Sequence, residues 1–250
     1  MWKNGESCVW PLLFFFLLGN GDSSEPAYIN ATLRSMVKIQ VNSTQRLEID
    51  EAELIEKNYS YGSGFYISED GLILTSTHVI NKASRLQDTP IQCVELDSGK
   101  TYGLIVIFRD DDSDISLLQN VRYTDFNTKR KDFIHLNASM NVLRDGVECF
   151  CLGVPNELHK YFGIYAISAG KVLRIAIDLA GADKVKSRKK ALLTSCEVAA
   201  GFSGGLVVDL AFNPLGIILG AVDSKQKKES YARKISDVLS VLKSHHVDIN

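Results

Sequence analysis

The sequence has almost no net charge, few cysteines and one long apolar run. It carries 28 Lys and Arg against 30 Asp and Glu, a formal net charge of −2. Dedicated nucleic-acid-binding domains are usually strongly basic, so this balance argues against nucleic acid as a partner. The apolar run covers residues 9–18. At about 10 residues it is too short to span a bilayer as a helix.

The apolar run nevertheless has the layout of a signal peptide. Lys3 precedes it and the small residues 19–21 follow it. We therefore predict a signal peptide over residues 1–21 and a flexible segment over residues 22–35. An uncleaved membrane anchor is the alternative, because Glu6 offsets the charge of Lys3, and contact with a membrane is expected only in that case. The predicted location is secreted, or the lumen of the secretory pathway.

Cysteines and glycosylation motifs agree with an oxidising compartment. Four cysteines remain once the leader is removed, and they form either disulfides or buried free thiols. Four Asn-X-Ser/Thr motifs predict a glycoprotein. The cysteines are Cys93, Cys149, Cys151 and Cys196, and the acceptor asparagines are Asn30, Asn42, Asn58 and Asn137.

Short β-rich runs separated by turn residues make up most of the chain. Residues 36–41 alternate weakly, and residues 63–76 form a clear hairpin around the turn at 69–71. Only residues 232–245 place apolar side chains at helical spacing. The pattern predicts an all-β protein, with paired barrels or a sandwich and one terminal helix.

One serine lies in a setting suited to catalysis. In Gly201-Phe202-Ser203-Gly204-Gly205 the glycines allow a tight turn that exposes the Ser203 hydroxyl. The same turn lets backbone N–H groups converge, as an oxyanion site requires. An ordinary glycine-rich hairpin turn explains the motif equally well. A catalytic serine also needs a general base and a group to orient that base.

Candidates for both groups occur earlier in the chain. His78 ends a strand and opens a short turn, where a side chain can face a cleft. Asp114 closes an acidic run and abuts an apolar strand, so it can be drawn inside to hydrogen-bond an imidazole. The acidic run lacks the rest of a calcium loop, because Ile115 and Val121 occupy the glycine and glutamate positions. We predict no metal site.

These three settings together resemble the trypsin-like serine proteases, specifically the HtrA/Do-like branch. The similarity extends over residues 36–242. Residues 193–198 and 213–217 are most similar to the peroxisomal leader-peptide-processing proteases of that branch. The stretches that carry the resemblance are Gly62-Ser63-Gly64-Phe65 with residues 72–80, Asp114-Ile115-Ser116-Leu117-Leu118, and residues 194–207.

The resemblance implies two antiparallel six-stranded β-barrels with a C-terminal helix. Residues 36–123 would form the N-terminal barrel with His78 and Asp114, and residues 124–132 a linker. Residues 133–245 would form the C-terminal barrel with Ser203 and the helix.

The resemblance also implies a serine endopeptidase that acts on proteins or peptides without a cofactor. Ser203 would be the nucleophile, His78 its general base and Asp114 the group that orients the imidazole. The backbone N–H groups of Gly201 and Ser203 would form the oxyanion hole. A homo-oligomer such as a trimer is compatible with the resemblance. The alternatives are a catalytically silent homologue that binds peptides or proteins, and a peroxisomal location, although residues 248–250 are not a peroxisomal tripeptide.

Two departures from the family pattern concern specificity. Phe202 replaces a small polar residue and is predicted to crowd the first leaving-group site. Glu197, six residues before Ser203, corresponds to the base of the substrate side-chain pocket. It either attracts a substrate Arg or Lys or points outward beside an apolar pocket. Basic clusters at residues 129–131, 184–190 and 225–228 are interpreted as solvated loops.

Overall fold

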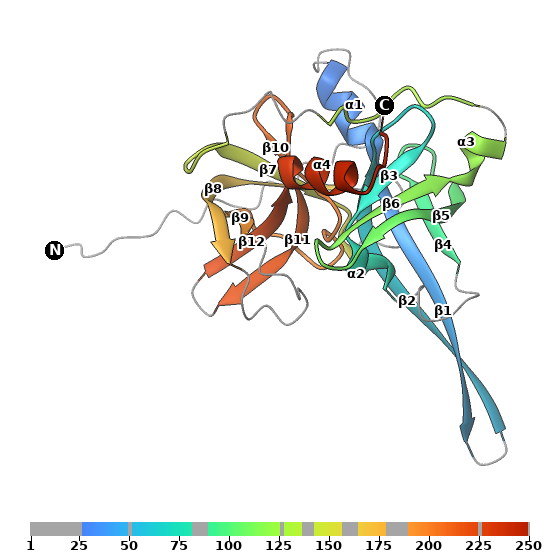
Figure 1. Cartoon of the computed structure of the whole chain (residues 1–250). Coiled ribbons are helices and arrows are strands. Elements are labelled where there is room, and N and C mark those ends of the chain that lie inside the picture. The colour runs from blue at the N-terminus through green and yellow to red at the C-terminus, as the bar shows by residue number, and fades with distance from the viewer. Residues whose placement is uncertain are drawn as a thin grey trace.

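The computed structural model describes residues 27–49, 52–81, 90–125, 128–136, 143–156, 165–178, 190–224 and 227–249. In these ranges the chain forms two closed six-stranded antiparallel barrels and a C-terminal helix, as the sequence predicted (Figure 1). The predicted leader and the Asn137 motif lie outside the described residues. No helix in the described part of the chain is long and apolar enough to cross a membrane.

The N-terminal barrel closes in the strand order β1-β2-β3-β6-β5-β4. One short helix, α2, interrupts it almost directly after β3, and a second, α3, follows its last strand, β6. The helix α1 precedes the barrel and occupies residues 27–35, part of the segment 22–35 that was predicted to be flexible. The elements are α1 (Ala27–Ser35), β1 (Met36–Ile49), β2 (Ala52–Tyr66), β3 (Leu72–Thr75), α2 (Thr77–Ile80), β4 (Ile91–Glu95), β5 (Thr101–Asp110), β6 (Ile115–Asn120) and α3 (Val121–Asp125).

The C-terminal barrel repeats the architecture in the strand order β10-β11-β12-β9-β8-β7. The helix α4 begins where β12 ends, and its buried residues Ile235, Val238 and Leu242 follow the helical spacing seen in the sequence. The elements are β7 (Glu148–Gly153), β8 (Ala166–Asp178), β9 (Lys190–Thr194), β10 (Leu206–Asp209), β11 (Pro214–Ser224), β12 (Lys227–Lys234) and α4 (Ile235–Ser244).

The hairpin of β1 and β2 is longer than the sequence indicated. Its register runs from Met36 opposite Phe65 to Ile49 opposite Ala52, and it projects well beyond the barrel (Figure 1). Within β1 only residues 36–41 carried a strand pattern, and within β2 only the residues from 63 onward. The remainder of β1 is mostly polar, so it lacks the alternation that marks a strand with one buried face.

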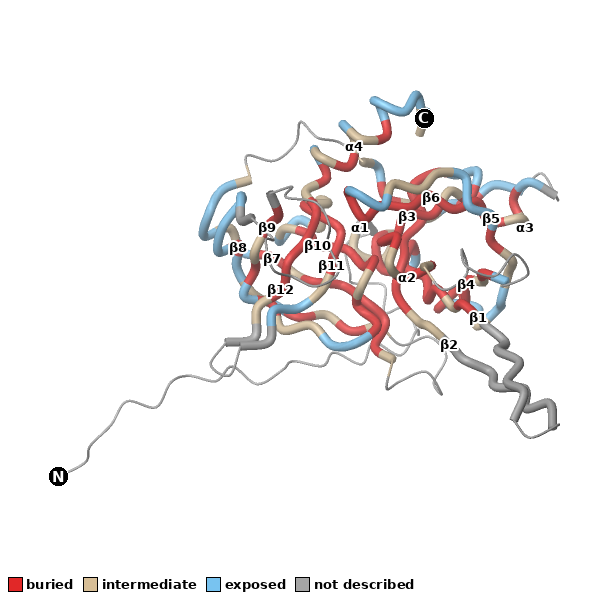
Figure 2. Tube along the Cα trace, turned by 60° about the horizontal axis from the view of Figure 1, so that its bottom comes forward, coloured by how far each residue is buried: buried red, intermediate tan, exposed pale blue. Residues whose placement is uncertain are grey.

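A hydrophobic cluster joins the two barrels. It includes Leu33 from α1, Leu117 from β6, Leu206 from β10 and Val238 from α4, all buried. Figure 2 shows the buried residues concentrated in the middle of the molecule, where the two barrels meet. Each fully buried leucine contributes roughly 1.5–3 kcal/mol. The shared cluster therefore fixes one barrel against the other, and with it the residues between them.

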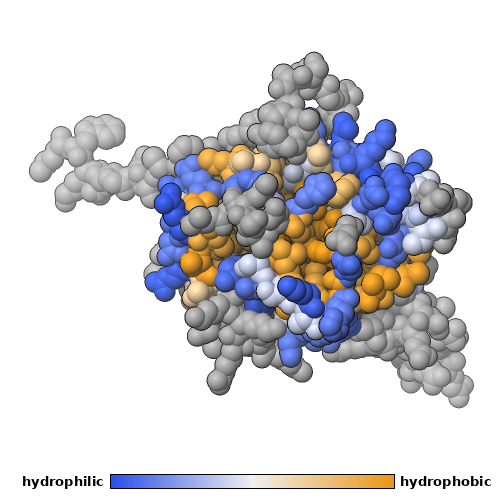
Figure 3. Space-filling view, turned by 45° about the horizontal axis from the view of Figure 1, so that its top comes forward, coloured by the Kyte–Doolittle hydropathy of each residue, from blue (hydrophilic) through white to orange (hydrophobic). Residues whose placement is uncertain are grey.

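The surface is not uniformly polar. Figure 3 shows hydrophobic residues gathered on one face among hydrophilic ones. Among the described residues β5 exposes three consecutive apolar side chains, Ile105, Val106 and Ile107, by 54%, 40% and 53%. A run of this kind is a candidate contact surface for another protein.

The four cysteines of the described residues are buried free thiols. This settles the choice that the sequence left open between thiols and disulfides. Cys149 Sγ and Cys196 Sγ lie 3.7 Å apart in the core of the C-terminal barrel. The contact with Cys196, together with burial, raises the pKa of Cys149, which keeps this thiol protonated.

Candidate active site

The serine turn connects the loop after β9 to β10 and depends on two glycines. Gly201 and Gly204 have φ of 101° and 82°, in the left-handed region that favours glycine. A Cβ on Gly201 would lie 2.3 Å from the Val154 carbonyl oxygen, and one on Gly204 would lie 2.2 Å from that of Ser63. Both the turn and the close backbone approach therefore require glycine.

The backbone of the turn directs two N–H groups away from the protein's own acceptors. The Ala200 carbonyl accepts from Asn156 N, and the Phe202 carbonyl accepts from Gly205 N, each at 2.8 Å. In a trans peptide the N–H points opposite to the C=O, so the N–H groups of Gly201 and Ser203 face the other way. Among the described residues neither donates to a backbone acceptor. This arrangement fits an oxyanion-binding site.

Ser63, on β2 of the N-terminal barrel, holds this turn in place. Its Oγ donates to the Gly201 carbonyl at 2.7 Å and accepts from Val154 N at 2.8 Å. Its backbone N–H donates to the Ser203 carbonyl at 2.8 Å. Ser63 is fully buried. A residue of one barrel thus hydrogen-bonds to three peptide groups of the other and fixes their orientation.

The structure brings His78 and Asp114 together. His78 lies in α2, and its Nδ1 is 2.6 Å from Asp114 Oδ2, while its backbone N–H donates to Asp114 Oδ1 at 2.8 Å. Asp114 is buried, whereas the His78 side chain is 21% exposed. With the carboxylate ionised, Nδ1 carries the proton and Nε2 is free to act as a base.

The histidine helix and the serine turn meet at the boundary between the barrels. Ser76 Oγ donates to the Ile218 carbonyl at 3.0 Å, and Gly204 N donates to the same oxygen at 2.7 Å. Ser76 is two residues before His78, and Gly204 follows Ser203. Ser203 Oγ is partly exposed and lies 3.4 Å from the Leu219 carbonyl.

Two residues singled out for specificity have different settings. Phe202 is 3% exposed and packs in the core of the C-terminal barrel. A Cβ on Gly153 would lie 2.6 Å from its ring. This corrects the prediction that the ring crowds the leaving-group site, because the side chain turns inward and only its backbone borders the turn. Glu197 is partly buried, and its role in a substrate pocket stays a prediction.

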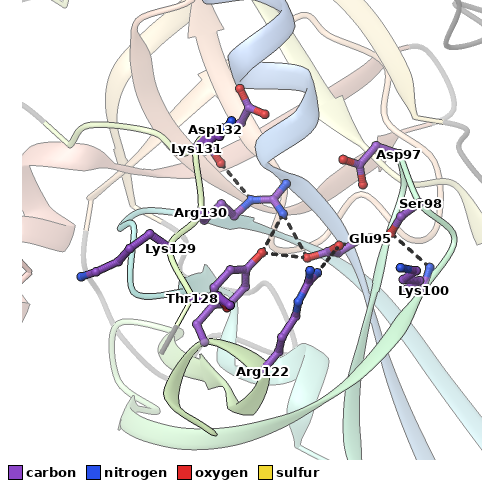
Figure 4. Close-up of a pocket in the computed structure, with 11 residues that line it drawn as sticks. Glu95, Asp97, Ser98, Lys100, Arg122, Thr128, Lys129, Arg130, Lys131 and Asp132 are labelled. Carbon is purple, nitrogen blue, oxygen red and sulfur yellow. Dashed lines mark hydrogen bonds and ion pairs between the residues drawn. The ribbon is translucent and has the colours of Figure 1, made fainter. Parts of the chain in front are cut away.

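A polar pocket of about 340 Å³ lies on the N-terminal barrel (Figure 4). At its base Glu95, 3% exposed, accepts from Arg130 Nη1 at 3.0 Å and from the hydroxyls of Tyr66 and Tyr123, each at 3.1 Å. Arg130 is 8% exposed, so the interpretation of residues 129–131 as a solvated cluster is wrong for this residue. Its guanidinium forms a buried ion pair with the Glu95 carboxylate.

No group of three or more metal-ligating side chains occurs within the described ranges. Sequence reasoning missed Ser63, to which it gave no role. The glycines on both sides of Ser63 were the available signal, since they permit the close approach of β2 to the serine turn.

Comparison with known proteins places the chain in a family. Residues 62–217 match the family described as "Trypsin-like peptidase domain". The chain is 30% identical over 156 residues to Serine protease HTRA1 of Xenopus laevis, covering 62% of this chain and 30% of that protein. It is 25% identical over 194 residues to Serine endoprotease DegS of Haemophilus influenzae, covering 78% and 48%. The chain thus spans 30% to 48% of the length of these two relatives.

Solved structures agree on the fold. The HtrA-type protease AlgW with decapeptide superposes with a TM-score of 0.66 at 20% identity, covering 90% of this chain and 69% of that chain. Deg5 gives 0.63 at 22% identity, covering 85% and 89%.

The chain therefore belongs to the trypsin-like peptidase family. Its relatives place it in the HtrA/Do-like branch that its motifs predicted. The closer similarity to the peroxisomal proteases stays a prediction.

Proposed function

We propose that this protein is a serine endopeptidase that cleaves peptide bonds through Ser203, His78 and Asp114. One observation carries the proposal: Asp114 binds His78 through both carboxylate oxygens, at the ring and at the backbone. A histidine held this way has one tautomer and one orientation, as a general base requires. Membership of the trypsin-like peptidase family supports the same chemistry.

The reaction proceeds in two halves. His78 Nε2 takes the proton of the Ser203 hydroxyl as Oγ attacks the peptide carbonyl carbon, and the N–H groups of Gly201 and Ser203 bind the resulting oxyanion. The imidazolium gives its proton to the leaving amine, and an acyl-enzyme remains on Ser203. Water then attacks this ester with His78 again as base, and the carboxylic acid product leaves. None of these steps uses a cofactor.

An active-site-directed fluorophosphonate tests the proposal without knowledge of the substrate. We expect labelling of the wild-type chain at Ser203, located by mass spectrometry, and none in Ser203→Ala. His78→Ala should label at least about a hundred times more slowly, because the hydroxyl loses its base. A folded wild-type chain that binds peptides yet fails to label would refute the enzyme and favour the silent homologue.

Proteins and peptides are the proposed substrates, since the relatives are proteases. We also propose assembly as a homo-oligomer. The exposed apolar run on β5 supports it, because such runs are often covered by a partner.

For location we keep the secretory pathway. The leader pattern and the Asn-X-Ser/Thr motifs support it, and peroxisomes are the alternative.

A further inference from the structure

A fully buried arginine lies where the two barrels meet. Arg233 belongs to β12 of the C-terminal barrel and is 0% exposed. Its Nε donates to the carbonyl of Ser113 at 3.1 Å, although Ser113 belongs to the N-terminal barrel. Ser113 is itself fully buried and immediately precedes Asp114. The side chain thus crosses the boundary between the barrels to reach the segment that carries the acidic residue.

Packing alone does not explain this residue. An apolar side chain of similar length would fill the same space without the desolvation cost of a guanidinium. Burial lowers the pKa of Arg233, and the carboxylates of Asp237, Asp114 and Asp110 act against that effect. On the same strand, burial raises the pKa of Tyr231, and the charge of Asp114 adds to it. The negative charge of Asp114 therefore affects the pKa of two side chains of β12, Tyr231 and Arg233.

The accepting carbonyl also has a mechanical role. It belongs to the peptide that links Ser113 to Asp114, so a hydrogen bond to it fixes the peptide plane that leads into Asp114. Asp114 has a φ of 56°, an uncommon value for a residue with a Cβ. On its other side the Asp114 carbonyl accepts from Thr77 N at 3.3 Å, next to His78. The corner is thus held from both barrels.

We propose that Arg233 is a positioning residue for the pair of Asp114 and His78. Its guanidinium fixes the peptide before Asp114, and its charge favours the ionised carboxylate. Arg233 contacts neither substrate nor reacting atoms, so it acts through Asp114. This inference rests on the proposed serine protease function and adds to it a residue, Arg233, that keeps Asp114 in position.

The positive charge of Arg233 predicts the direction in which the pH profile shifts when the residue is replaced. The charged and titratable groups that interact with the Asp114 carboxylate are His78, Arg233 and Tyr231, and Arg233 also interacts with Asp237 and Asp110. Removing the cation makes protonation easier at the remaining groups, both at the carboxylate and at the imidazole. Either protonation stops general-base catalysis. The acid limb of the pH profile should then move to higher pH, by about half a pH unit or more.

The experiment compares Arg233→Met, Arg233→Lys and Lys234→Met. The rate and half-saturation of fluorophosphonate labelling are measured from pH 5 to 9, beside thermal unfolding. We expect Arg233→Met to label at least about tenfold more slowly with unchanged half-saturation and a raised acid limb. Its stability should change little, since an apolar replacement of a buried ion is often tolerated. Arg233→Lys should keep the wild-type acid limb. Lys234→Met loses the same charge from a side chain that pairs with Asp237, and should behave as wild type.

A folded Arg233→Met with the wild-type rate and acid limb overturns the inference. So does Arg233→Lys with the acid limb of Arg233→Met, because the charge would then have no role. If Arg233→Met does not fold, Arg233→Lys decides alone: a wild-type acid limb supports the inference and a shifted one refutes it. A wild-type chain that does not label refutes the proposed function instead.

Discussion

Ser63→Ala tests whether the N-terminal barrel positions the oxyanion donors. The substitution removes one buried oxygen and leaves the backbone hydrogen bond from Ser63 N to the Ser203 carbonyl in place. Two buried groups lose their partner, the Gly201 carbonyl and the Val154 N–H. The perturbation is therefore confined to the two peptide segments that border the serine turn.

The structure sets the size of both expected effects. An unpaired buried polar group costs about 1–3 kcal/mol, so the two together should lower the free energy of unfolding by about 2–6 kcal/mol. Removing one oxyanion donor outright typically lowers kcat about 100- to 1000-fold. Ser63→Ala loosens the turn without deleting a donor. We therefore expect kcat to fall about 10- to 100-fold with little change in KM.

The assay is turnover of a fluorogenic casein, with the folded fraction taken from circular dichroism at the same temperature. Ser35→Ala is the matched control, because Ser35 is also fully buried and its Oγ donates to the Thr32 carbonyl at 2.6 Å in α1. The control should lose about 1 kcal/mol of stability and keep its kcat. A folded Ser63→Ala enzyme with wild-type kcat would refute the reasoning, because the turn would then hold its shape unaided.

Three further predictions concern specificity, thiol chemistry and processing. Profiling on a peptide library should show cleavage after Val, Leu or Ala, unaltered by Glu197→Ala; a preference for Arg or Lys that the variant abolishes would instead establish a charged pocket. Burial raises the pKa of Cys93 to about 12 from 9.0, so iodoacetamide at pH 8 should modify it only after unfolding, as mass spectrometry can detect. Because the unfolded thiol ionises first, the free energy of unfolding should also fall as pH rises from about 9 toward 12. The mature chain should begin near Asp22 and lose mass on deglycosylation; a full-length, unglycosylated chain from peroxisomes or cytosol would contradict the secretory prediction.

The barrels were predictable because local signals and the family resemblance agree. The hairpin of residues 63–76 and the glycine turn around Ser203 each specify their own backbone. The pairing of His78 with Asp114 is different, since 36 residues separate them. No local pattern connects two residues so far apart, and the resemblance supplied that link.

The remaining features depend on contacts that a sequence does not display. Arg130 lies in a basic run that suggests solvent exposure, and only its meeting with Glu95 explains its burial. Phe202 turns inward because Gly153, from another strand, leaves space for its ring. Ser63 and Arg233 each donate a hydrogen bond to a backbone carbonyl of the opposite barrel. Every residue has a backbone carbonyl, so the sequence does not indicate which of them accepts such a bond.

The contacts across the barrel boundary run in both directions. Ser63 and Ser76 of the N-terminal barrel donate to carbonyls of the C-terminal barrel, and Arg233 donates the opposite way, over distances of 2.7 to 3.1 Å. A hydrogen bond stretched to about 3.6 Å no longer counts as one, so lengthening all three bonds by about 0.9 Å would break them all. These bonds hold the oxyanion turn, the histidine helix and the acidic corner. The packing of the barrels and the geometry of the site are therefore coupled. We expect any ligand or partner that changes the angle between the barrels to change the proposed activity without contacting Ser203.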